Sequence, residues 1–315
     1  MNHNVGEASL LLHELDELVK AHRDLEVVLM PPMLSLQTLN LQVNHRKFKL
    51  GAQNLYWRDQ GAFTGEVSAN QLRGLVKYAL VGHSERRHVF NETNRDTSKK
   101  VQAAIRNRIK PVLCIGETLS ERADGETGDV LRDQLVAGLA NVTSEDIADV
   151  VIAYEPVWAI GTGENAKPSD VEMAIRAIRA QIKHLFGPAV AKAVPVLYGG
   201  SVNADNASAY LAVNGSDGLL VGGASLNAKS FADIIKKAML AKDKDALRAL
   251  RGIKSLILLA ETEKGGIDGL DKDAEVKLLT KAAKQRKDSA EIYKQQGRAD
   301  LEKTEVDELE IINKY

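Results

Sequence analysis

The feature that most constrains this fold is a regular alternation of short apolar runs with longer stretches of helical periodicity. Stretches such as Asn94–Arg108, Asp129–Ala140 and Pro168–Phe186 carry apolar residues three and four positions apart, which is typical of one helix face. Strands that alternate with helices predict a parallel sheet with crossover helices. The apolar runs are nearly continuous, as expected of strands buried on both faces. Seven runs are predicted as strands: Glu26–Met30, Phe48–Gln53, Tyr78–Gly82, Pro111–Ile115, Val150–Tyr154, Val194–Tyr198 and Gly218–Val221.

Two architectures fit such an alternation, an open doubly wound sheet and a closed (β/α)8 barrel. The usual dinucleotide fingerprint, G-x-G-x-x-G after the first strand, is absent from the sequence. An open sheet concentrates its site at one switch point, whereas a barrel draws on most of its strand ends. Six strand ends carry glycine or reactive polar residues, which favours the barrel: Gln53–Asn54, Gly82–Glu85, Gly116–Glu117, Glu155, Tyr198–Ser201 and Gly222–Gly223.

The character of the sequence changes after about Lys242. Residues 245–315 contain helical stretches dense in Lys, Arg, Asp and Glu, with no strand-like runs among them. We therefore predict an α/β barrel over residues 1–240 and a small all-helical domain over residues 241–315. The boundary is blurred, because Phe231–Leu240 fits both the last barrel helix and the start of the second domain.

Composition narrows the class of protein. The net charge of −1 gives no overall basic field that would recruit nucleic acid. Cys114 is the single cysteine, which excludes an intramolecular disulfide and a multi-cysteine zinc site and suits a reducing compartment. No apolar run approaches membrane-spanning length, and the first residues do not read as a secretory signal. We therefore expect a soluble cytoplasmic protein, and the candidate residues described below include neither metal ligands nor a nucleotide motif.

Glu155 is the first candidate catalytic residue. It follows the apolar strand that ends at Tyr154, and Pro156 and the Gly161-Thr162-Gly163 segment come directly behind it. A carboxylate most often caps a helix or pairs with an arginine. At the end of a barrel strand, however, a carboxylate held in a dry pocket has a raised proton affinity and can serve as a general base. The proline and the glycines resemble the two ends of a lid.

His83 is the second candidate. Of the seven histidines it alone ends an apolar strand, and Ser84-Glu85 then opens a turn or helix. Backbone N–H groups at such a helix start disfavour a positive ring, so the imidazole is expected to stay neutral and to donate a hydrogen bond. A lone histidine is usually structural, but its position at a strand end favours function here.

Glycines at the last two strand ends form the third group. Gly199-Gly200-Ser201 and Gly222-Gly223 each precede a helical segment, where bare backbone N–H groups can hold a phosphate. Gly161 would join them when the lid closes. Most Gly-Gly pairs are ordinary turns, so the argument depends on their combination. A base, a neutral imidazole and a phosphate site together suggest proton abstraction next to a carbonyl in a small phosphorylated sugar.

The segments GAQN, GAFTGEVSA, VGHSERR, CIGE, AYEPVWAIGTG, YGGSV and LVGGASL together resemble the triosephosphate isomerase family, in order and at its spacings, over residues 2–240. The resemblance implies a TIM barrel, a homodimer and a cofactor-free interconversion of D-glyceraldehyde 3-phosphate and dihydroxyacetone phosphate. In this family a Glu base and a neutral His are the known pair. By resemblance Glu155 moves the proton, His83 polarises the carbonyl and Glu85 conditions the site. The remaining implied roles are phosphate binding by Gly161, Ser201, Gly222 and Gly223, and insertion of Thr64 beside the partner's site.

One departure from the family is serious. The family's first strand ends in Asn-x-Lys, whose ammonium holds the substrate, and the residues after that lysine are often Met-Asn. This sequence begins at Met1-Asn2, so we expect the first strand to be absent, while the following helix, Glu7–His22, is present. Three explanations stay open: truncation upstream, a degenerate non-catalytic barrel, or replacement of the strand by another segment or partner. Loss of the lysine predicts a nearly inactive chain, and unpaired strand edges predict aggregation.

The C-terminal part has a resemblance of its own. The segments KKAMLAKDKDALRALRGIKS, AEVKLLTKAAKQRKDSAEIYKQQGRADL and EVDELEIINKY resemble the first half of the small YqeY-type helical family, related to the tail of the glutamyl-tRNA amidotransferase B subunit. The resemblance implies association with tRNA, for which Lys281, Lys284, Arg286 and Lys287 offer a basic face. Interleaved Glu and Asp favour a solvated helix equally well. The alternative to an isomerase is therefore a non-catalytic barrel that carries a tRNA-associated module.

Overall fold

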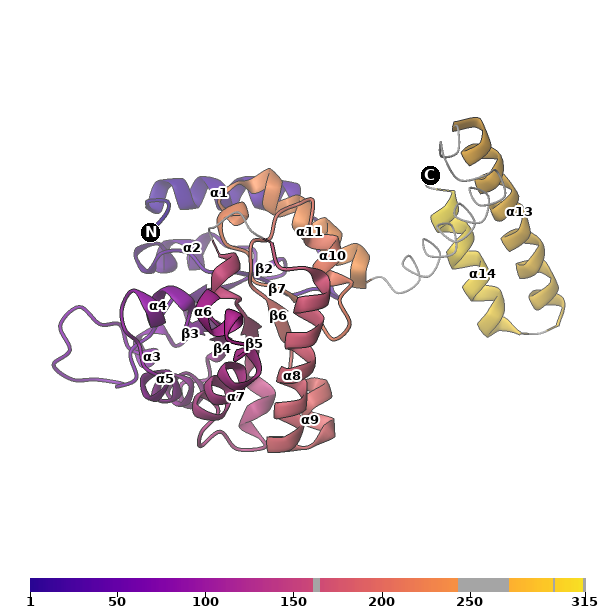
Figure 1. The fold of residues 1–315 in the computed structure, drawn as a ribbon. Coiled ribbons are helices and arrows are strands. Elements are labelled where there is room, and N and C mark those ends of the chain that lie inside the picture. Colours follow the sequence, from indigo (N-terminus) through magenta and orange to yellow (C-terminus); the bar gives the residue numbers. More distant parts are fainter. Residues whose placement is uncertain (161–164, 243–271, 297, 314–315) are drawn as a thin grey trace. The chain divides into compact units, whose positions relative to one another are not determined.

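The computed structural model describes residues 1–160, 165–242, 272–296 and 298–313 (Figure 1). The chain divides into two compact units, Met1–Ala238 and Met239–Tyr315, and each is described here by itself. No helix among the described residues is long and apolar enough to cross a membrane.

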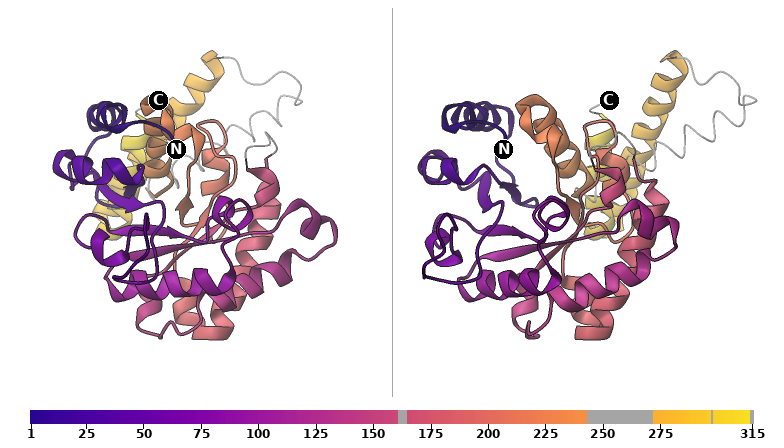
Figure 2. Two further views of the ribbon diagram at one scale, coloured as in Figure 1. Left: turned by 90° about the vertical axis from the view of Figure 1, so that its left-hand side faces the viewer. Right: turned by 60° about the vertical axis from the view of Figure 1, so that its left-hand side comes forward.

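The first unit contains one curled parallel sheet with helices along its outside (Figures 1 and 2). The strands lie side by side in the order of the chain, and each pairs in parallel with the next. Within the described residues β1 and β7 pair with one neighbour each, so the sheet has two edges. The seven predicted strands are confirmed to within two residues: β1 (Val27–Leu29), β2 (Phe48–Ala52), β3 (Tyr78–Val81), β4 (Lys110–Ile115), β5 (Val151–Tyr154), β6 (Val196–Tyr198) and β7 (Gly218–Leu219).

Helices connect the strands, as the alternation predicts. The helices of the first unit are α1 (Val5–Leu18), α2 (Leu36–Gln42), α3 (Ala69–Leu72), α4 (Ser84–His88), α5 (Asn94–Arg106), α6 (Leu119–Ala123), α7 (Thr127–Gly138), α8 (Pro168–Phe186), α9 (Pro188–Ala193), α10 (Ala207–Leu211) and α11 (Ala228–Lys242). Short 3-10 helices are η1 (Met33–Ser35), η2 (Asp146–Asp149), η3 (Val157–Ala159) and η4 (Gly223–Leu226). The parallel α/β fold predicted for this part of the chain is thereby confirmed.

Strand alternation divides the core into two clusters. On β4, Leu113 and Ile115 pack in the larger cluster with the surrounding helices, whereas Val112 and Cys114 belong to a smaller cluster. This follows from the pleat, which points successive side chains to opposite faces of a sheet. The smaller cluster also contains Ala153 of β5. Side chains of its parity lie on the concave side of the sheet, and Glu155, two residues after Ala153, shares that parity.

The second unit contains two described helices, α13 (Lys272–Gln295) and α14 (Ala299–Ile312), which pack against each other. Arg286 of α13 donates to Glu305 at 3.1 Å and lies 3.1 Å from a carboxylate oxygen of Glu308, both on α14. Glu308 is almost fully buried. Arg286 therefore fastens the two helices together, and only the remaining lysines of the predicted basic face are exposed.

Candidate active site

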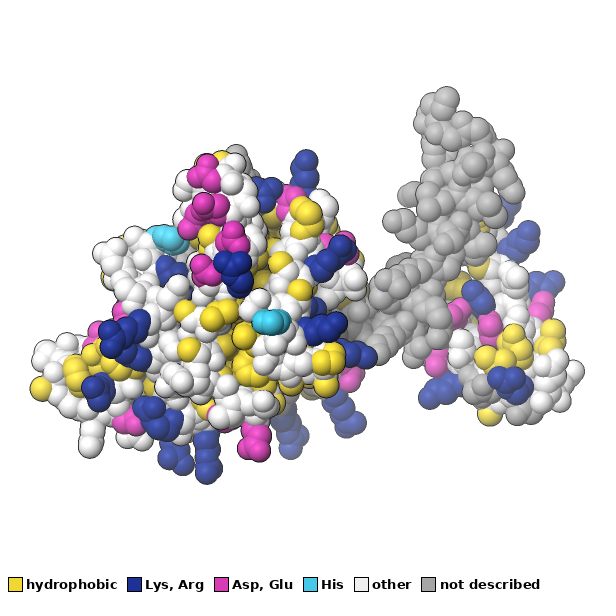
Figure 3. Space-filling view, turned by 60° about the horizontal axis from the view of Figure 1, so that its bottom comes forward, with side chains coloured by type: hydrophobic (Ala, Val, Ile, Leu, Met, Phe, Trp, Pro, Cys, Tyr) yellow, Lys and Arg dark blue, Asp and Glu magenta, His cyan; other side chains and the backbone are white. Residues whose placement is uncertain are grey.

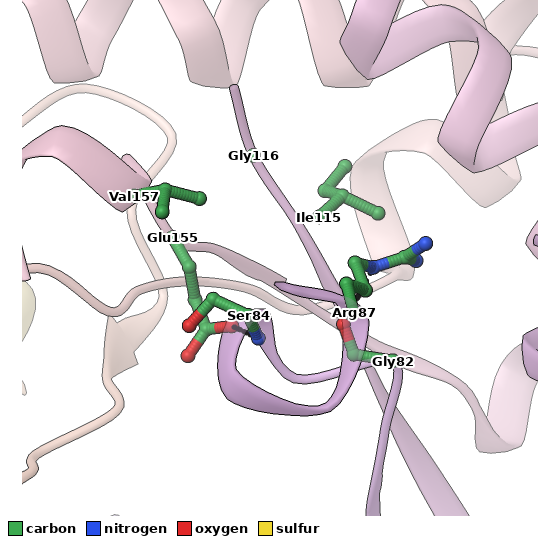
Figure 4. Close-up of a pocket in the computed structure, with 7 residues that line it drawn as sticks. All are labelled: Gly82, Ser84, Arg87, Ile115, Gly116, Glu155 and Val157. Carbon is green, nitrogen blue, oxygen red and sulfur yellow. Dashed lines mark hydrogen bonds between the residues drawn. The ribbon is translucent and has the colours of Figure 1, made fainter. Parts of the chain in front are cut away.

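The carboxyl ends of β3, β4 and β5 meet around a small pocket. Its lining comes from the loop after β3, the end of β4 and the loop after β5: Gly82, Ser84, Arg87, Ile115, Gly116, Glu155 and Val157 (Figure 4). These are three of the six strand ends at which the sequence has glycine or reactive polar residues. The pocket therefore lies where a parallel barrel builds its site.

Glu155 is buried, with 2% of its surface exposed, and both carboxylate oxygens have partners. Oε1 lies 2.9 Å from Nε2 of His83, and Oε2 accepts from the backbone N–H of Ser84 at 3.1 Å. Figure 4 shows the carboxylate beside Ser84, while the guanidinium of Arg87 points to the opposite side. The two residues predicted as base and proton donor are thus in direct contact.

His83 caps the N-terminus of α4. Its Nδ1 accepts a hydrogen bond from the backbone N–H of Glu85 at 3.3 Å, which favours the tautomer that carries its proton on Nε2. Nε2–H then donates to Glu155. Burial alone would lower the pKa of His83, but the hydrogen bond and charge of Glu155, together with the charge of Glu85, raise it above the ordinary value. A backbone donor and an acidic partner therefore act on this imidazole in opposite directions.

Gly82 makes the contact between His83 and Glu155 possible. Strand parity would place His83 on the helix side of the sheet with Val81, whose side chain packs in the larger core cluster. Gly82 instead adopts φ +70°, a left-handed conformation that favours glycine, and the chain turns there. A Cβ at this position would also lie 2.7 Å from the guanidinium of Arg87. The glycine redirects His83 toward the pocket.

Glu85 lies at the edge of this arrangement. Its side chain is 75% exposed, and its nearer carboxylate oxygen is 3.9 Å from Nδ1 of His83. The backbone N–H of Glu85 contacts the imidazole directly, whereas its carboxylate acts on His83 through charge.

The predicted phosphate-binding residues follow β6 and β7, which are adjacent strands. Ser201 donates its hydroxyl to the carbonyl of Ala159 at 2.5 Å, so it contacts the segment after Glu155. Gly222 and Gly223 are exposed, and a Cβ at either would meet no atom within 4 Å. Gly161 lies outside the described residues.

Arg87 is a site residue that sequence reasoning missed. Its guanidinium donates to the carbonyl of Gly82 at 2.6 Å, to the side chain of Asn94 at 2.7 Å and to the carbonyl of Cys114 at 3.1 Å. It therefore ties the end of β3 to β4. The available signal was its position four residues after His83, on the helix that His83 caps.

Glu92 is a second missed residue. It is buried and accepts hydrogen bonds from Arg86 at 2.7 Å, Lys100 at 2.5 Å and the backbone N–H of Gly82 at 3.2 Å. Burial would raise the pKa of this carboxyl, but the bonds and charges of Lys100 and Arg86 outweigh it and lower the pKa. Lys100 in turn donates to Asn54 at 2.7 Å, just after β2. One ion-pair network thus connects the ends of two strands.

Thr64 lies in the loop between β2 and α3 and is exposed. Its neighbour Phe63 packs its ring against Tyr56, which stacks on Trp57, so aromatic contacts hold the base of the loop. Phe63, Val89 and Phe90 are large apolar side chains that stay exposed in this unit. Among the described residues no group of three or more His, Cys, Asp or Glu side chains is placed to hold a metal ion.

A buried carboxylate in contact with an imidazole, at the carboxyl ends of a curled parallel sheet, defines the class of acid–base enzymes on α/β barrels. A family model described as triosephosphate isomerase matches residues 1–238. The chain belongs to the triosephosphate isomerase family. The triosephosphate isomerase of Caldanaerobacter subterraneus subsp. tengcongensis is 47% identical over 236 residues, which cover 75% of this chain and 95% of that protein. Those of Alkaliphilus metalliredigens and Clostridium perfringens are 42% and 44% identical with the same coverage.

A second family model, described as Yqey-like protein, matches residues 228–315. The two matches overlap at residues 228–238, which lie within α11. This is the stretch in which the sequence predicted both the last barrel helix and the start of a helical domain.

Proposed function

We propose that the first unit interconverts D-glyceraldehyde 3-phosphate and dihydroxyacetone phosphate without a cofactor. Membership in a family whose relatives carry the name of that isomerase supports the reaction. The single observation that carries the mechanism is the 2.9 Å contact between Oε1 of Glu155 and Nε2 of His83. We expect the reaction to take place in the cytoplasm.

Glu155 acts as the general base. It removes a proton from the carbon next to the substrate carbonyl and returns it to the neighbouring carbon, so that an enediolate forms between the two steps. Without substrate, both oxygens of the Glu155 carboxylate have partners within the chain, which are His83 and Ser84. Substrate binding exchanges these contacts for the reacting carbon.

His83 polarises the carbonyl. With Nδ1 accepting from the backbone N–H of Glu85, the proton on Nε2 is the one available for donation. The same hydrogen that bonds Glu155 in the chain alone turns to the substrate oxygen, where negative charge develops in the enediolate. Ser201, Gly222 and Gly223, with Gly161, bind the phosphate through backbone N–H groups and the serine hydroxyl.

Replacement of Glu155 by Gln tests this assignment. The amide has nearly the same shape and cannot take the proton, so kcat in a coupled assay of glyceraldehyde 3-phosphate isomerisation should fall about 10³-fold with little change in KM. The matched control is Glu172→Gln, which removes a carboxylate of α8 that pairs with Arg176 at 3.5 Å on the surface. Equal turnover by the wild type and Glu155→Gln would contradict the proposal.

The open edges of the sheet favour a second proposal, that this chain by itself is a weak isomerase. Among the residues that the structure describes, β1 and β7 each have one side without a strand partner, and Arg87 is the only cation among the seven residues that line the pocket. That guanidinium already donates hydrogen bonds to two backbone carbonyls and to the side-chain oxygen of Asn94. A triose phosphate dianion needs a cation whose hydrogen-bond donors are available to the substrate.

A strand added at the N-terminus tests this second proposal. By the family resemblance the strand ends in Asn-x-Lys, and it should pair in parallel with β1 and β7. The extended chain should gain two to three orders of magnitude in kcat/KM over the chain of 315 residues, while the same extension with Met in place of that Lys should gain stability only. Equal turnover by both extended chains would contradict a role for the added cation.

We also propose that the first unit forms a homodimer through the loop that carries Thr64. Phe63, which directly precedes Thr64, is an exposed aromatic side chain of the kind that partners bury. Thr64→Arg should shift the sedimentation coefficient toward that of the monomer, because a charged side chain resists burial. An unchanged dimer would rule out this loop.

For the second unit we propose weak association with tRNA through Lys281, Lys284 and Lys287 of α13. All three are exposed, whereas Arg286 pairs with α14. Figure 3 shows Lys and Arg side chains interleaved with Asp and Glu on the visible face, so any binding should be weak and salt-sensitive. Reversal of the three lysines to Glu should abolish a tRNA mobility shift at low salt; a shift that persists would refute this face.

A further inference from the structure

The side chain of Gln134 bonds twice to the backbone of one residue at the rim of the pocket. Its Oε1 accepts from the N–H of Gly116 at 2.9 Å, and its Nε2 donates to the carbonyl of Gly116 at 3.2 Å. A side-chain amide presents a donor and an acceptor side by side, as a peptide group does. Gln134 therefore holds Gly116 as a neighbouring strand would, at the point where β4 has ended.

Gly116 in turn lies against the backbone of the catalytic base. A Cβ built on it would lie 1.8 Å from the carbonyl oxygen of Glu155 and 2.5 Å from its carbonyl carbon. On either side of this contact, backbone hydrogen bonds join the two segments. The N–H of Glu155 donates to the carbonyl of Ile115 at 2.8 Å, and the N–H of Val157 donates to the carbonyl of Glu117 at 3.0 Å. The position of Gly116 thus limits where the backbone of Glu155 can lie.

The helix that carries Gln134 is itself fixed against β4. Leu131 and Leu135 of α7 are buried, and a Cβ at Gly138 would lie 2.6 Å from the side chain of Leu113. The close approach that Gly138 allows brings α7 near enough for Gln134 to reach the end of the strand. Gln134 is only partly buried, so its amide is not needed to fill the core.

We propose that Gln134 is a positioning residue for the acid–base pair. By fixing both backbone groups of Gly116, it sets the place of the Glu155 backbone and, through it, the contact of the carboxylate with His83. The inference rests on the proposed role of Glu155 as the base. Its test therefore includes a measurement that needs no turnover.

The test compares Gln134→Met with a matched control. Methionine keeps the length of the side chain and removes both hydrogen bonds. The control is Gln102→Met on α5, which removes a glutamine that donates to a backbone carbonyl, that of Ala140 at 3.2 Å, away from the pocket. Three quantities are measured on the whole chain: urea stability, kcat and KM for glyceraldehyde 3-phosphate, and the pKa of His83 by NMR, with the His83 resonance assigned by its loss in His83→Asn.

Gln134→Met should lower kcat about 10- to 100-fold with KM changed less than about threefold, because a shifted base loses alignment with the reacting carbon. The pKa of His83 should fall at the same time, since the contact with Glu155 is what raises it. Gln102→Met should change stability alone. A His83 pKa equal to that of the wild type in Gln134→Met would overturn the proposal, and a shifted pKa without measurable turnover would support it while speaking against the isomerase activity of the chain.

A second variant separates positioning from packing. In Gln134→Glu an ionised carboxylate can accept from Gly116 N–H but repels the carbonyl oxygen, whereas a protonated carboxyl supplies both bonds. The kcat of this variant relative to the wild type should therefore rise as the pH is lowered through the titration of residue 134. A ratio that does not depend on pH would contradict a role for the paired hydrogen bonds.

Discussion

Gly116→Ala places one methyl group between the end of β4 and the backbone of Glu155. The new Cβ would lie 1.8 Å from the carbonyl oxygen of Glu155, so the two backbone segments must separate by about 1.6 Å to reach the 3.4 Å of an ordinary contact. The obstructing atoms are backbone, which cannot rotate away as the end of a side chain could. Overpacking of this kind should lower the free energy of unfolding by about 1–3 kcal/mol.

The effect on catalysis should be of similar size to the effect on folding. A misplacement of about 1 Å can slow an enzyme about 10²-fold, which corresponds to about 2.7 kcal/mol of activation free energy. We therefore expect kcat of Gly116→Ala to fall at least 10²-fold in the coupled isomerase assay, with a lowered His83 pKa in NMR titrations.

The control for this prediction is Gly128→Ala on α7. A Cβ at Gly128 meets no atom within 4 Å, so the substitution should stabilise the chain by about 0.4–1 kcal/mol and leave kcat unchanged. If Gly116→Ala kept kcat within threefold of the wild type and an unchanged His83 pKa, the claim that Gly116 limits the position of Glu155 would be wrong.

Three further predictions concern other charged groups. Glu92→Gln leaves the buried Lys100 without its anion and should lower the free energy of unfolding by about 3–5 kcal/mol in urea titrations. Because the pKa of Glu92 is lowered on folding, this difference from the wild type should be full above the ordinary carboxyl pKa of 4.5 and should shrink as the pH falls through the folded value. Glu155→Gln should lower the pKa of His83; since the wild-type pKa is raised, the stabilisation from this contact is present below pH 6.5 and lost as the pH rises through the folded value, which unfolding measured across that range will show. Arg286→Met removes the cation that Glu305 and Glu308 of α14 share and should lower the helical circular dichroism that the C-terminal residues contribute, whereas Lys281→Met should not.

The strand pattern could be predicted because parallel strands buried on both faces have nearly continuous apolar sequences. All seven runs became strands, and α8 has the bounds that its proline start and apolar spacing predicted. The candidate pair was predictable for a similar reason. A carboxylate and an imidazole that end apolar strands must lie at the same end of a parallel sheet, and Glu155 and His83 do.

The supporting residues could not be predicted in this way. Arg87, Glu92 and Gln134 lie within helices or loops, where charged and amide side chains are ordinary. Their hydrogen-bond partners are mostly backbone atoms, such as both backbone groups of Gly116 for Gln134, and backbone atoms carry no sequence signal. Likewise, Arg286 looked like one cation of a basic face until α14 supplied its two carboxylates.

The sequence by itself determined the order of strands and helices, the family, and the two candidate residues for the chemistry, since each follows from local pattern. Only the tertiary structure decided which way those side chains face and what holds them. Gly82, at φ +70°, turns His83 toward Glu155 against strand parity, and Gly116 lets two backbones approach more closely than any side chain would allow. Both effects depend on distances between segments far apart in the chain, which pattern within a segment does not contain.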